Sequence, residues 1–374
     1  MREFTDGSTA IVRGALAAGC TFFSGYPITP ASPILMAMMR ELPKVGGVAI
    51  QAEDELAAIG MCIGAAMSGA RAFTATSGPG ISLYSENIGL AIMGEVPLVI
   101  VDVQRQGPST GGSTTVGQGD VQFVRWGTAG GYPIIALAPS SIPECYSLTM
   151  KAFDLAERFR CPVFLLTDKE LNLTMNTVDV DQYQDVPVQE RKTYRAEDGR
   201  EGVFAPYRYH PPDTVPPMAH FGEDVIVRFT GSTHDERAFI TKHPPTVDAL
   251  NQHLAAKIEE HLDEIEMVRA DLEPEAKTLL VSYGMTARAM CEGVQRARGQ
   301  GKTVSALTIQ SLWPVPETAI QSALEGVERI VVAELNLGQY RREIKRIGRD
   351  QEILGLNRVD GELISPEQFL EVIR

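Results

Sequence analysis

The stretch "ARAFTATSGPGISLYSENIGLAIMGEVPLVIVDVQR", residues 70–105, decides the fold class. Two short apolar runs, "ARAFTATSG" and "PLVIVDVQR", are separated by a glycine turn and by an amphipathic segment at residues 81–93 that has helical spacing. Apolar strands that alternate with helices are typical of a parallel sheet covered by helices on both faces. The stretch therefore predicts an α/β fold with a doubly wound sheet.

The same alternation continues on both sides of this stretch, from about residue 5 to residue 173. Amphipathic segments at residues 33–42, 56–68 and 142–158 predict further helices. Four more apolar runs predict strands: "CTFFSGYP", "GVAIQAED", "YPIIALAP" and "CPVFLLTD". We therefore expect a first α/β domain over residues 1–175.

The rest of the chain changes character twice. Residues 176–275 are charged and rich in proline, and they predict an irregular linker or excursion that ends in a helix at residues 246–273. From residue 276 the runs "TLLVSYG", "TVSALTIQSLWP" and "ERIVVAELN" again predict strands with helices between them. We expect a second, smaller α/β domain over residues 276–374.

Charge and composition exclude several classes of function. The 374 residues carry a formal net charge of −14, whereas a protein that mainly binds nucleic acid phosphates needs clustered Lys and Arg. The sequence contains no run of about 18 apolar residues, which is the length that a membrane-spanning helix needs. The opening "MREFTDGST" lacks the basic and apolar segments of a signal peptide. We expect a cytoplasmic enzyme that binds neither nucleic acid nor membrane.

Cysteine and histidine spacing gives no metal motif. The five cysteines include no CxxC pair, so the usual ligand spacing of zinc and iron–sulfur sites is missing. Four of the six histidines lie in the irregular segment, at spacings that fit no standard metal motif: His210, His220, His234 and His243. We predict no metal site in this chain.

The stretch "SGYPITPAS", residues 24–32, lies where a predicted strand gives way to a helix. Pro27 fixes its own backbone, and Pro30 disfavours a helical conformation at Thr29. Loops at the carboxyl ends of parallel strands are where α/β proteins bind ligands. Thr29 or Ser32 is equally suited to cap the helix. The residues alone leave both functions open.

Three acidic residues, Glu53, Asp54 and Glu55, stand at the next strand-to-helix junction. Acidic residues in the first turn are favourable against the helix dipole, so their placement alone requires no function. The helix that follows is rich in small residues, which favour close packing: Ala57, Ala58, Gly60, Gly64, Ala65, Ala66 and Gly69. A carboxyl on such a helix is expected to be partly buried, where its charged form is disfavoured.

Two further loops follow predicted strands. "TATSGPGISL" places a glycine turn before a helix, which suits an anion or a close ligand, but it matches neither a P-loop nor a dinucleotide motif. "VDVQRQGPSTGG" ends a strand on Arg105, whose guanidinium is suited to hold a carboxylate beside Ser109 and Thr110. A solvated arginine on a surface loop fits the same composition, so the residues alone do not decide.

In this order the segments resemble the alpha subunit of 2-oxoacid:ferredoxin oxidoreductases, which use thiamine diphosphate to convert a 2-oxo acid and coenzyme A into an acyl-CoA. The resemblance spans nearly the whole chain. It is strongest to the 2-oxoglutarate branch, through the "EDE" triplet, the "YRYH" element at residues 207–210 and the terminal "ISPEQ". The segments that carry it are "GYPITPAS", "QAEDELAAIG", "TATSGPGISL", "VPLVIVDVQRQGPSTG", "QGD", "SLWPVP" and "VAELNLGQY".

The resemblance implies a division of labour between subunits. The first domain would be a pyrimidine-binding thiamine-diphosphate domain, and the last would resemble the transketolase C-terminal domain. A beta subunit would hold the diphosphate end of the cofactor, its Mg²⁺ and a [4Fe–4S] cluster, in an (αβ)₂ heterotetramer that reduces ferredoxin. The implied reaction is the reversible oxidative decarboxylation of 2-oxoglutarate with coenzyme A to succinyl-CoA and CO₂.

The resemblance also implies which residues bind the cofactor. Among the three acidic residues, the spacing to Gly60 and Gly64 favours Glu55 as the catalytic carboxyl. In its protonated form Glu55 would hydrogen-bond N1′ of the aminopyrimidine ring. The other implied cofactor contacts are Tyr26, Pro27, Ile28, Ser77 and Gly78.

Thr29 and Arg105 are the implied catalytic residues that contact the substrate, with Ser109 and Thr110 beside its carboxylate. One departure is "GGST" at residues 111–114, where relatives often read "GQPT" or "GMPT", so the loop that shapes substrate choice lacks a proline. Two alternatives stay open. One is the same chemistry on pyruvate, a branched-chain or an aryl 2-oxo acid, and the other is a non-catalytic thiamine-fold protein that serves only in assembly.

Overall fold

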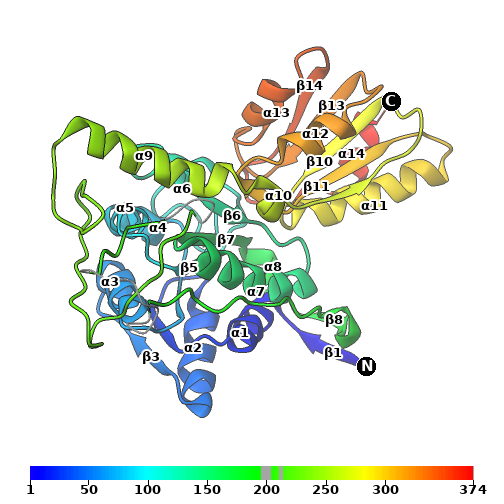
Figure 1. Ribbon diagram of the computed structural model, residues 1–374. Coiled ribbons are helices and arrows are strands. Elements are labelled where there is room, and N and C mark those ends of the chain that lie inside the picture. The colour runs from blue at the N-terminus through cyan, green and yellow to red at the C-terminus, as the bar shows by residue number, and fades with distance from the viewer. Residues whose placement is uncertain (195–203, 210–213, 374) are drawn as a thin grey trace.

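The computed structural model of the chain describes residues 1–194, 204–209 and 214–373. Its two large sheets lie in separate lobes (Figure 1). One has seven strands in the order β12-β6-β7-β5-β4-β2-β3, and the other has five in the order β14-β13-β10-β11-β9. A separate antiparallel ribbon pairs β1 Arg2–Thr5 with β8 Asn176–Asp179. No helix within the described residues is long and apolar enough to cross a membrane.

The first lobe is built from alternating strands and helices. Its strands are β2 Phe22–Gly25, β3 Val48–Gln51, β4 Ala72–Thr76, β5 Leu98–Gln104, β6 Ile135–Leu137, β7 Pro162–Asp168 and, from far along the chain, β12 Ser311–Trp313. Its helices are α1 Gly7–Ala17, α2 Ser32–Glu41, α3 Glu55–Met67, α4 Pro79–Leu83, α5 Ser85–Met93, α6 Val121–Trp126, α7 Ile142–Phe159 and α8 Lys169–Leu173, with the 3₁₀ turns η1 Leu42–Val45 and η2 Val180–Gln182.

The central strand β5 shows why helices cover both faces of this sheet. Leu98 and Ile100 pack in a core with residues of α3 and α5. Val99, Val101 and Val103 point to the opposite face and pack with residues of α1, α2 and α7, since successive side chains of a strand alternate in direction. Burial of each such side chain contributes about 1.5–3 kcal/mol. The predicted doubly wound α/β fold is confirmed.

The second lobe follows the same plan. Its strands are β9 Val268–Asp271, β10 Thr278–Ser282, β11 Ser305–Ile309, β13 Arg329–Glu334 and β14 Glu352–Asn357, and its helices are α11 Thr286–Gly299, α12 Glu317–Ala323, α13 Arg341–Ile347 and α14 Pro366–Val372. Leu280 and Val331 pack with α11 and α14 on one face of the sheet. Val281 and Val332 pack with α12 and α13 on the other, so this lobe is also an α/β unit.

One predicted strand is divided between the two sheets. The run at residues 303–314, expected as a single strand of the second domain, forms β11 in the five-stranded sheet and β12 in the seven-stranded sheet, where β12 pairs antiparallel with β6. The cause is burial against the first lobe. Leu312 is fully buried, and the indole N–H of Trp313 donates to the carbonyl oxygen of Val121 at 3.0 Å.

Two predicted helices also differ from the structure. The segment at residues 81–93 forms α4 and α5, which are separated by Tyr84, a fully buried residue whose hydroxyl contacts that of Thr74 at 2.9 Å. The helix expected at residues 246–273 ends early: α9 Pro244–Glu259 and α10 Leu262–Ile265 are followed by strand β9. That strand pairs antiparallel with β11, and Arg298 binds the Asp271 carboxylate at 2.8 Å. The second sheet thus begins before residue 276, where we expected the domain to start.

Candidate functional site

The carboxyl edge of the seven-stranded sheet gathers the loops that the sequence singled out. β2, β3, β4 and β5 are parallel, so the loops that follow them meet at one edge. From β2 the chain moves outward to β3, and it then returns to β4 on the other side of β2. A reversal of this kind opens a crevice at the carboxyl edge, where α/β sheets bind ligands.

Glu55 is the buried member of the acidic triplet. It is 7% exposed and is the first residue of α3, whereas Glu53 and Asp54 are exposed. Asp54 caps the helix, because its carboxylate accepts the N–H of Ala57 at 2.7 Å. The cap fixes the start of α3, and the Glu55 carboxyl makes no hydrogen bond to another residue in the described part of the chain.

Gly80, in the first turn of α4, allows the chain to pass close to Glu55. A methyl group on Gly80 would lie 2.0 Å from the hydroxyl oxygen of Thr76 and 3.1 Å from Oε1 of Glu55, so a larger residue is excluded. The buried hydroxyls of Thr76 and Ser77 have no hydrogen-bond partner among the described residues. Since unpaired buried polar groups are rare and costly, these two hydroxyls are suited to contact polar atoms of a ligand.

Arg105 connects two of the loops. It is buried, and its guanidinium donates to the carbonyl oxygens of Thr29 at 2.5 Å and Thr110 at 3.2 Å. Its Nε has no partner within the described residues. The side chain therefore orders the loop after β2 together with its own loop, and Nε is left for a further acceptor.

Thr29 does not cap α2. The helix begins at Ser32 and has Ala31 as its N-cap, and no side chain makes a capping hydrogen bond there. The capping alternative is therefore wrong for both Thr29 and Ser32. Thr29 is exposed and is held through its carbonyl oxygen by Arg105. The same loop contains the other residues predicted to contact the cofactor there, of which the first two are exposed and the third half-buried: Tyr26, Pro27 and Ile28.

Sequence patterns did not reveal two carboxyls beside Arg105. Asp102 is fully buried in β5, and one of its oxygens accepts the N–H of Gly78 at 3.3 Å. Oδ2 of Asp102 and Oδ2 of Asp120 have no hydrogen-bond partner among the described residues. Burial, with the Asp120 carboxyl beside it, raises the pKa of Asp102 well above its usual range. Burial also raises the pKa of Asp120 to about 6, although Asp102 and Arg105 oppose this shift.

These residues border a cavity of about 570 Å³ between the two lobes. Its walls come from the loops after β4 and β5 and from residues 335–339 of the second lobe. Gly78, Arg105 and Ser109 are part of its lining; Thr110 is not, but its carbonyl oxygen accepts from Arg105. Within the described residues, Arg105 and Asp120 are the only charged side chains of its lining.

Gln118 of the "QGD" motif binds the second lobe to this site. Its backbone N–H donates to the carbonyl oxygen of Leu335 at 2.9 Å, and its carbonyl oxygen accepts from Asn336 at 2.7 Å. Its side-chain oxygen accepts from the Thr286 hydroxyl at 3.0 Å. The "QGD" and "VAELN" motifs thus hold the two lobes together next to Asp120.

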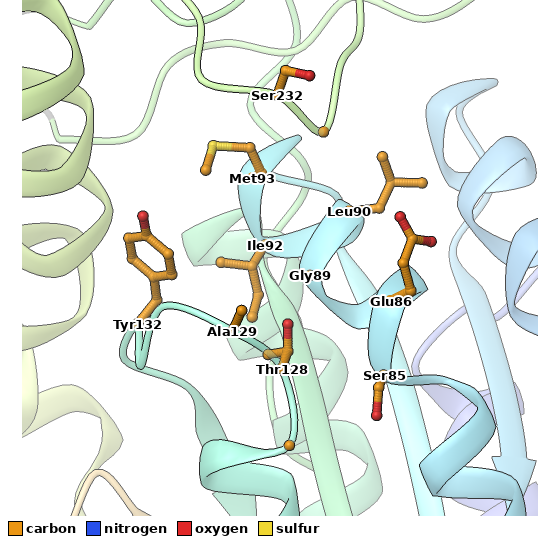
Figure 2. A pocket seen from close by; sticks show the side chains of 12 residues that line it. Ser85, Glu86, Gly89, Leu90, Ile92, Met93, Thr128, Ala129, Tyr132 and Ser232 are labelled. Atoms are coloured by element: carbon orange, nitrogen blue, oxygen red, sulfur yellow. The ribbon is translucent and has the colours of Figure 1, made fainter. Parts of the chain in front are cut away.

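A second cavity, of about 680 Å³, lies elsewhere and is lined by α5, the loop at residues 127–132 and residues 231–232 (Figure 2). Glu86 is its only charged side chain among the described residues, and Leu90, Ile92 and Met93 supply apolar surface. None of the unpaired buried polar atoms of the described chain belongs to its lining. It lacks the features that distinguish the cavity between the lobes.

The histidines of the middle segment do not come together. His220 contacts an acidic side chain, His234 contacts backbone carbonyl groups, and His243 contacts a threonine hydroxyl. His210 lies outside the described residues. Across residues 1–194, 204–209 and 214–373 no group of His, Cys, Asp and Glu side chains is arranged to hold a metal ion.

The residues at the carboxyl edge fit the aminopyrimidine end of thiamine diphosphate. A buried carboxyl at Glu55, unpaired hydroxyls at Thr76 and Ser77, and the close approach at Gly80 suit a flat ring with polar atoms on its edge. The described part of the chain offers no ligand set for the Mg²⁺ that accompanies a diphosphate.

Comparisons with known proteins agree with this arrangement. Residues 13–252 match the family model for the thiamine-diphosphate-binding domain of pyruvate flavodoxin/ferredoxin oxidoreductases, and residues 276–369 match core domain II of pyruvate:ferredoxin oxidoreductase. The 2-oxoglutarate synthase subunit KorA of Methanothermobacter thermautotrophicus is 40% identical over 372 residues, which cover 99% of this chain and 97% of that protein. The ketoisovalerate oxidoreductase subunit VorB of the same organism is 35% identical over 381 residues, covering 100% and 97%.

Solved structures agree as well. The 2-oxoglutarate:ferredoxin oxidoreductase of Magnetococcus marinus, with 2-oxoglutarate, coenzyme A and succinyl-CoA bound, matches with a TM-score of 0.92 and 31% identity, over 99% of this chain and 64% of that one. A split-gene transketolase matches with a TM-score of 0.54 and 11% identity, over 98% and 95% of the two chains, which shows a shared fold alone. The chain therefore belongs to the pyruvate flavodoxin/ferredoxin oxidoreductase family, whose members bind thiamine diphosphate.

Proposed function

We propose that this chain is the pyrimidine-binding alpha subunit of a 2-oxoglutarate:ferredoxin oxidoreductase. The reaction is the reversible conversion of 2-oxoglutarate and coenzyme A to succinyl-CoA and CO₂, with two electrons passing to ferredoxin through a partner subunit. The observation that carries the proposal is the group of unpaired buried polar atoms beside Glu55 and Arg105. Relatives named 2-oxoglutarate synthase subunit support the choice of substrate.

Glu55 is assigned to the aminopyrimidine ring. When bound, thiamine diphosphate supplies a carbon nucleophile at C2 of its thiazolium ring. The Glu55 carboxyl would hydrogen-bond a ring nitrogen, and this contact would favour loss of the C2 proton. The burial of Glu55 and the exposure of Glu53 and Asp54 support this assignment. Ser77 and Gly78, which follow β4, are assigned to the same ring.

Arg105 is assigned to the carboxylate of the 2-oxo acid. An arginine suits this role because the carboxylate leaves as neutral CO₂, so the charge attraction is absent from the product. The unpaired Nε and the position of Arg105 on the cavity support the assignment. Thr29 is assigned to the reacting end of the substrate, and Ser109 to the wall of the cavity.

The exposed side of α3 supports a partner subunit. Leu56 and Met61 are 48% and 40% exposed, and methyl groups added at Gly60 and Gly64 would meet nothing within 4 Å. The close packing that the small residues predict is therefore available to another chain. We assign this surface to a beta subunit that supplies the Mg²⁺ and diphosphate site and a [4Fe–4S] cluster, in an (αβ)₂ heterotetramer.

A cytoplasmic location is part of the proposal. All five cysteines are free thiols: Cys20, Cys62, Cys145, Cys161 and Cys291. Unpaired cysteines are typical of proteins in a reducing compartment.

The test is an assay of the complex co-purified with its beta subunit. We expect reduction of a one-electron acceptor to require both coenzyme A and a 2-oxo acid, with the highest kcat/KM for 2-oxoglutarate among 2-oxoglutarate, pyruvate, 2-oxoisovalerate and an aryl 2-oxo acid. The second candidate, a branched-chain substrate, is favoured by the ketoisovalerate relative. A higher kcat/KM for 2-oxoisovalerate selects it. A complex that turns over none of the four acids would favour the assembly module.

A further inference from the structure

We infer that Asp120, positioned by Asp102, accepts the proton of the coenzyme A thiol as the thioester forms. The inference rests on the proposed function and adds to it a residue that the sequence did not single out. It starts from the cavity between the lobes, where Arg105 and Asp120 are the only charged side chains of the described lining. A guanidinium does not give up its proton in proteins, so Asp120 is the base of this cavity.

The reaction leaves one proton to be placed. The bond between the carboxylate and the 2-oxo carbon of 2-oxoglutarate breaks and CO₂ leaves. A bond then forms between that carbon and the sulfur of coenzyme A, and two electrons pass singly to ferredoxin. The charges balance only when the hydrogen of the thiol is released as a proton. Asp120 takes this proton and returns it to solvent through the cavity.

The backbone around Asp120 shows that its side chain is not used for helix capping. Asp120 is the N-cap of α6 but makes no capping hydrogen bond. The aspartates at the N-caps of α1, α3 and α8 all accept a backbone N–H there: Asp6, Asp54 and Asp168. The backbone N–H of Asp120 is held by Oε1 of Gln104 at 3.2 Å, while its buried Oδ2 has no partner in the described chain.

Asp102 is a positioning residue for this base. Asp102 is fully buried, and Asp120 and Arg105 are charged groups that act on its carboxyl. Asp102 and Arg105 in turn act on Asp120. Burial raises the pKa of both carboxyls; in addition Asp120 raises the pKa of Asp102, whereas Asp102 lowers that of Asp120. This is the pattern expected when Asp102 keeps its proton and donates it toward an ionised Asp120. Asp120 is then a base whose pKa lies close to the working pH, as proton transfer requires.

The test separates the step before the thiol from the step that consumes it. In the complete complex, CO₂ released in the first turnover without coenzyme A reports binding and decarboxylation. Steady-state turnover reports thioester formation. For Asp120→Asn we expect kcat/KM for coenzyme A to fall about 100-fold, with first-turnover CO₂ release changed less than about twofold. Asp6→Asn is the matched control, since asparagine also caps a helix and Asp6 caps α1 away from the site.

Each outcome has a distinct meaning. If the wild-type complex releases no CO₂ from 2-oxoglutarate, the proposed function fails. If it does, and Asp120→Asn turns over coenzyme A normally, the inference is overturned while the function stands. An equal loss of both activities in Asp120→Asn also overturns the inference, because the residue would then act before the thiol.

The role of Asp102 has its own readout. In Asp102→Asn the side-chain amide can still donate a hydrogen bond to Asp120. We therefore expect the acid limb of the pH profile of kcat/KM for coenzyme A to stay near its wild-type pH. Asp102→Ala removes the donor from a buried carboxylate, so the limb should move to higher pH. An acid limb at the same pH in both variants would exclude the positioning role, since a purely structural effect lowers activity without moving it.

Discussion

Two buried groups of charged side chains lie at opposite ends of β5, and they differ in how completely they are paired. Before the amino end of the strand, Glu95 binds Lys257 at 2.8 Å and contacts His253 at 3.1 Å. Although burial opposes it, the Lys257 charge and the His253 hydrogen bond hold the pKa of Glu95 below its usual range. Beyond the carboxyl end, Arg105 and its neighbouring carboxyls retain unpaired atoms within the described chain.

The comparison shows that burial alone does not identify a functional charge. Each member of the Glu95 group finds its partner inside the chain, and the group attaches α9 to the first lobe. In the Arg105 group, Arg105 and Asp102 are buried and Asp120 is half-buried, but the pairing is incomplete. Since an unpaired buried polar atom costs about 1–3 kcal/mol, its presence is best explained by a ligand that completes the pairing.

The largest effect on stability is expected for Glu95→Gln. The substitution leaves Lys257 buried without a counter-ion, so the free energy of unfolding should fall by about 3–5 kcal/mol, measured by denaturant titration. Turnover per folded complex should be unchanged. As a control, Glu223→Gln removes an exposed contact to His220 and should cost about 0–1 kcal/mol. Similar losses in the two variants would show that the Glu95 group does not hold the fold.

Arg105→Met should act on catalysis. We expect kcat/KM for the 2-oxo acid to fall about 100-fold or more, because one partner of a buried charge interaction with the substrate is lost. Arg105→Lys keeps the charge without the planar fork and should give an intermediate value. A loss of stability with unchanged kcat/KM would show that Arg105, like Glu95, stabilises the fold and does not bind the substrate.

The pH dependence of stability distinguishes the two groups further. Burial raises the pKa of Asp120 to about 6 in the folded state, above the value of about 3.9 for an unfolded aspartate. The folded state therefore binds more protons between these values, and stability falls as the pH rises from about 4 to 6. Asp120→Asn removes this contribution, so we expect it to gain about 1–2 kcal/mol relative to wild type across that window. If the curves of stability against pH for wild type and Asp120→Asn ran parallel between about pH 4 and pH 6, the raised pKa of Asp120 would be contradicted.

Thr29→Val is expected to give the smallest effect. Loss of one hydroxyl hydrogen bond to the substrate should lower kcat by about tenfold, with stability changed by less than about 0.5 kcal/mol. For comparison, Ser141→Ala removes a true cap, since the Ser141 hydroxyl accepts the N–H of Glu144, and should cost about 1 kcal/mol. If Thr29→Val lowered the melting temperature as much as Ser141→Ala does, Thr29 would act as a helix cap and not as a substrate contact.

Much of the fold could be predicted from local sequence. The run at residues 98–104 is apolar except for Asp102 and Gln104 and is followed by Arg105, which predicted both a buried strand and a charge at its carboxyl end. The place of β12 could not be predicted in this way. Whether Ser311–Trp313 joins one sheet or the other depends on the contact of Trp313 with Val121, which lies far away in sequence.

The candidate site was predictable only in part for the same reason. Glu55 and Arg105 each stand at a recognisable junction of strand and helix or loop. The proximity of Asp102 and Asp120 depends on the path of the loop between them, which Gln118 fixes through contacts to the second lobe. An aspartate within an otherwise apolar strand was the available signal. The small residues of α3 predicted a close approach, but Gly60 and Gly64 face outward, away from the core that Ile59 and Cys62 enter.

The most direct test of the central claim, that Glu55 activates thiamine diphosphate, is the rate at which the C2 proton of the cofactor exchanges with deuterium in the co-purified complex. We predict that Glu55→Gln lowers this rate by about 10²–10⁴-fold without weakening assembly with the beta subunit. Asp54→Asn, which keeps the helix cap, should exchange as wild type does. Exchange at the wild-type rate in Glu55→Gln would contradict the assignment of the catalytic carboxyl.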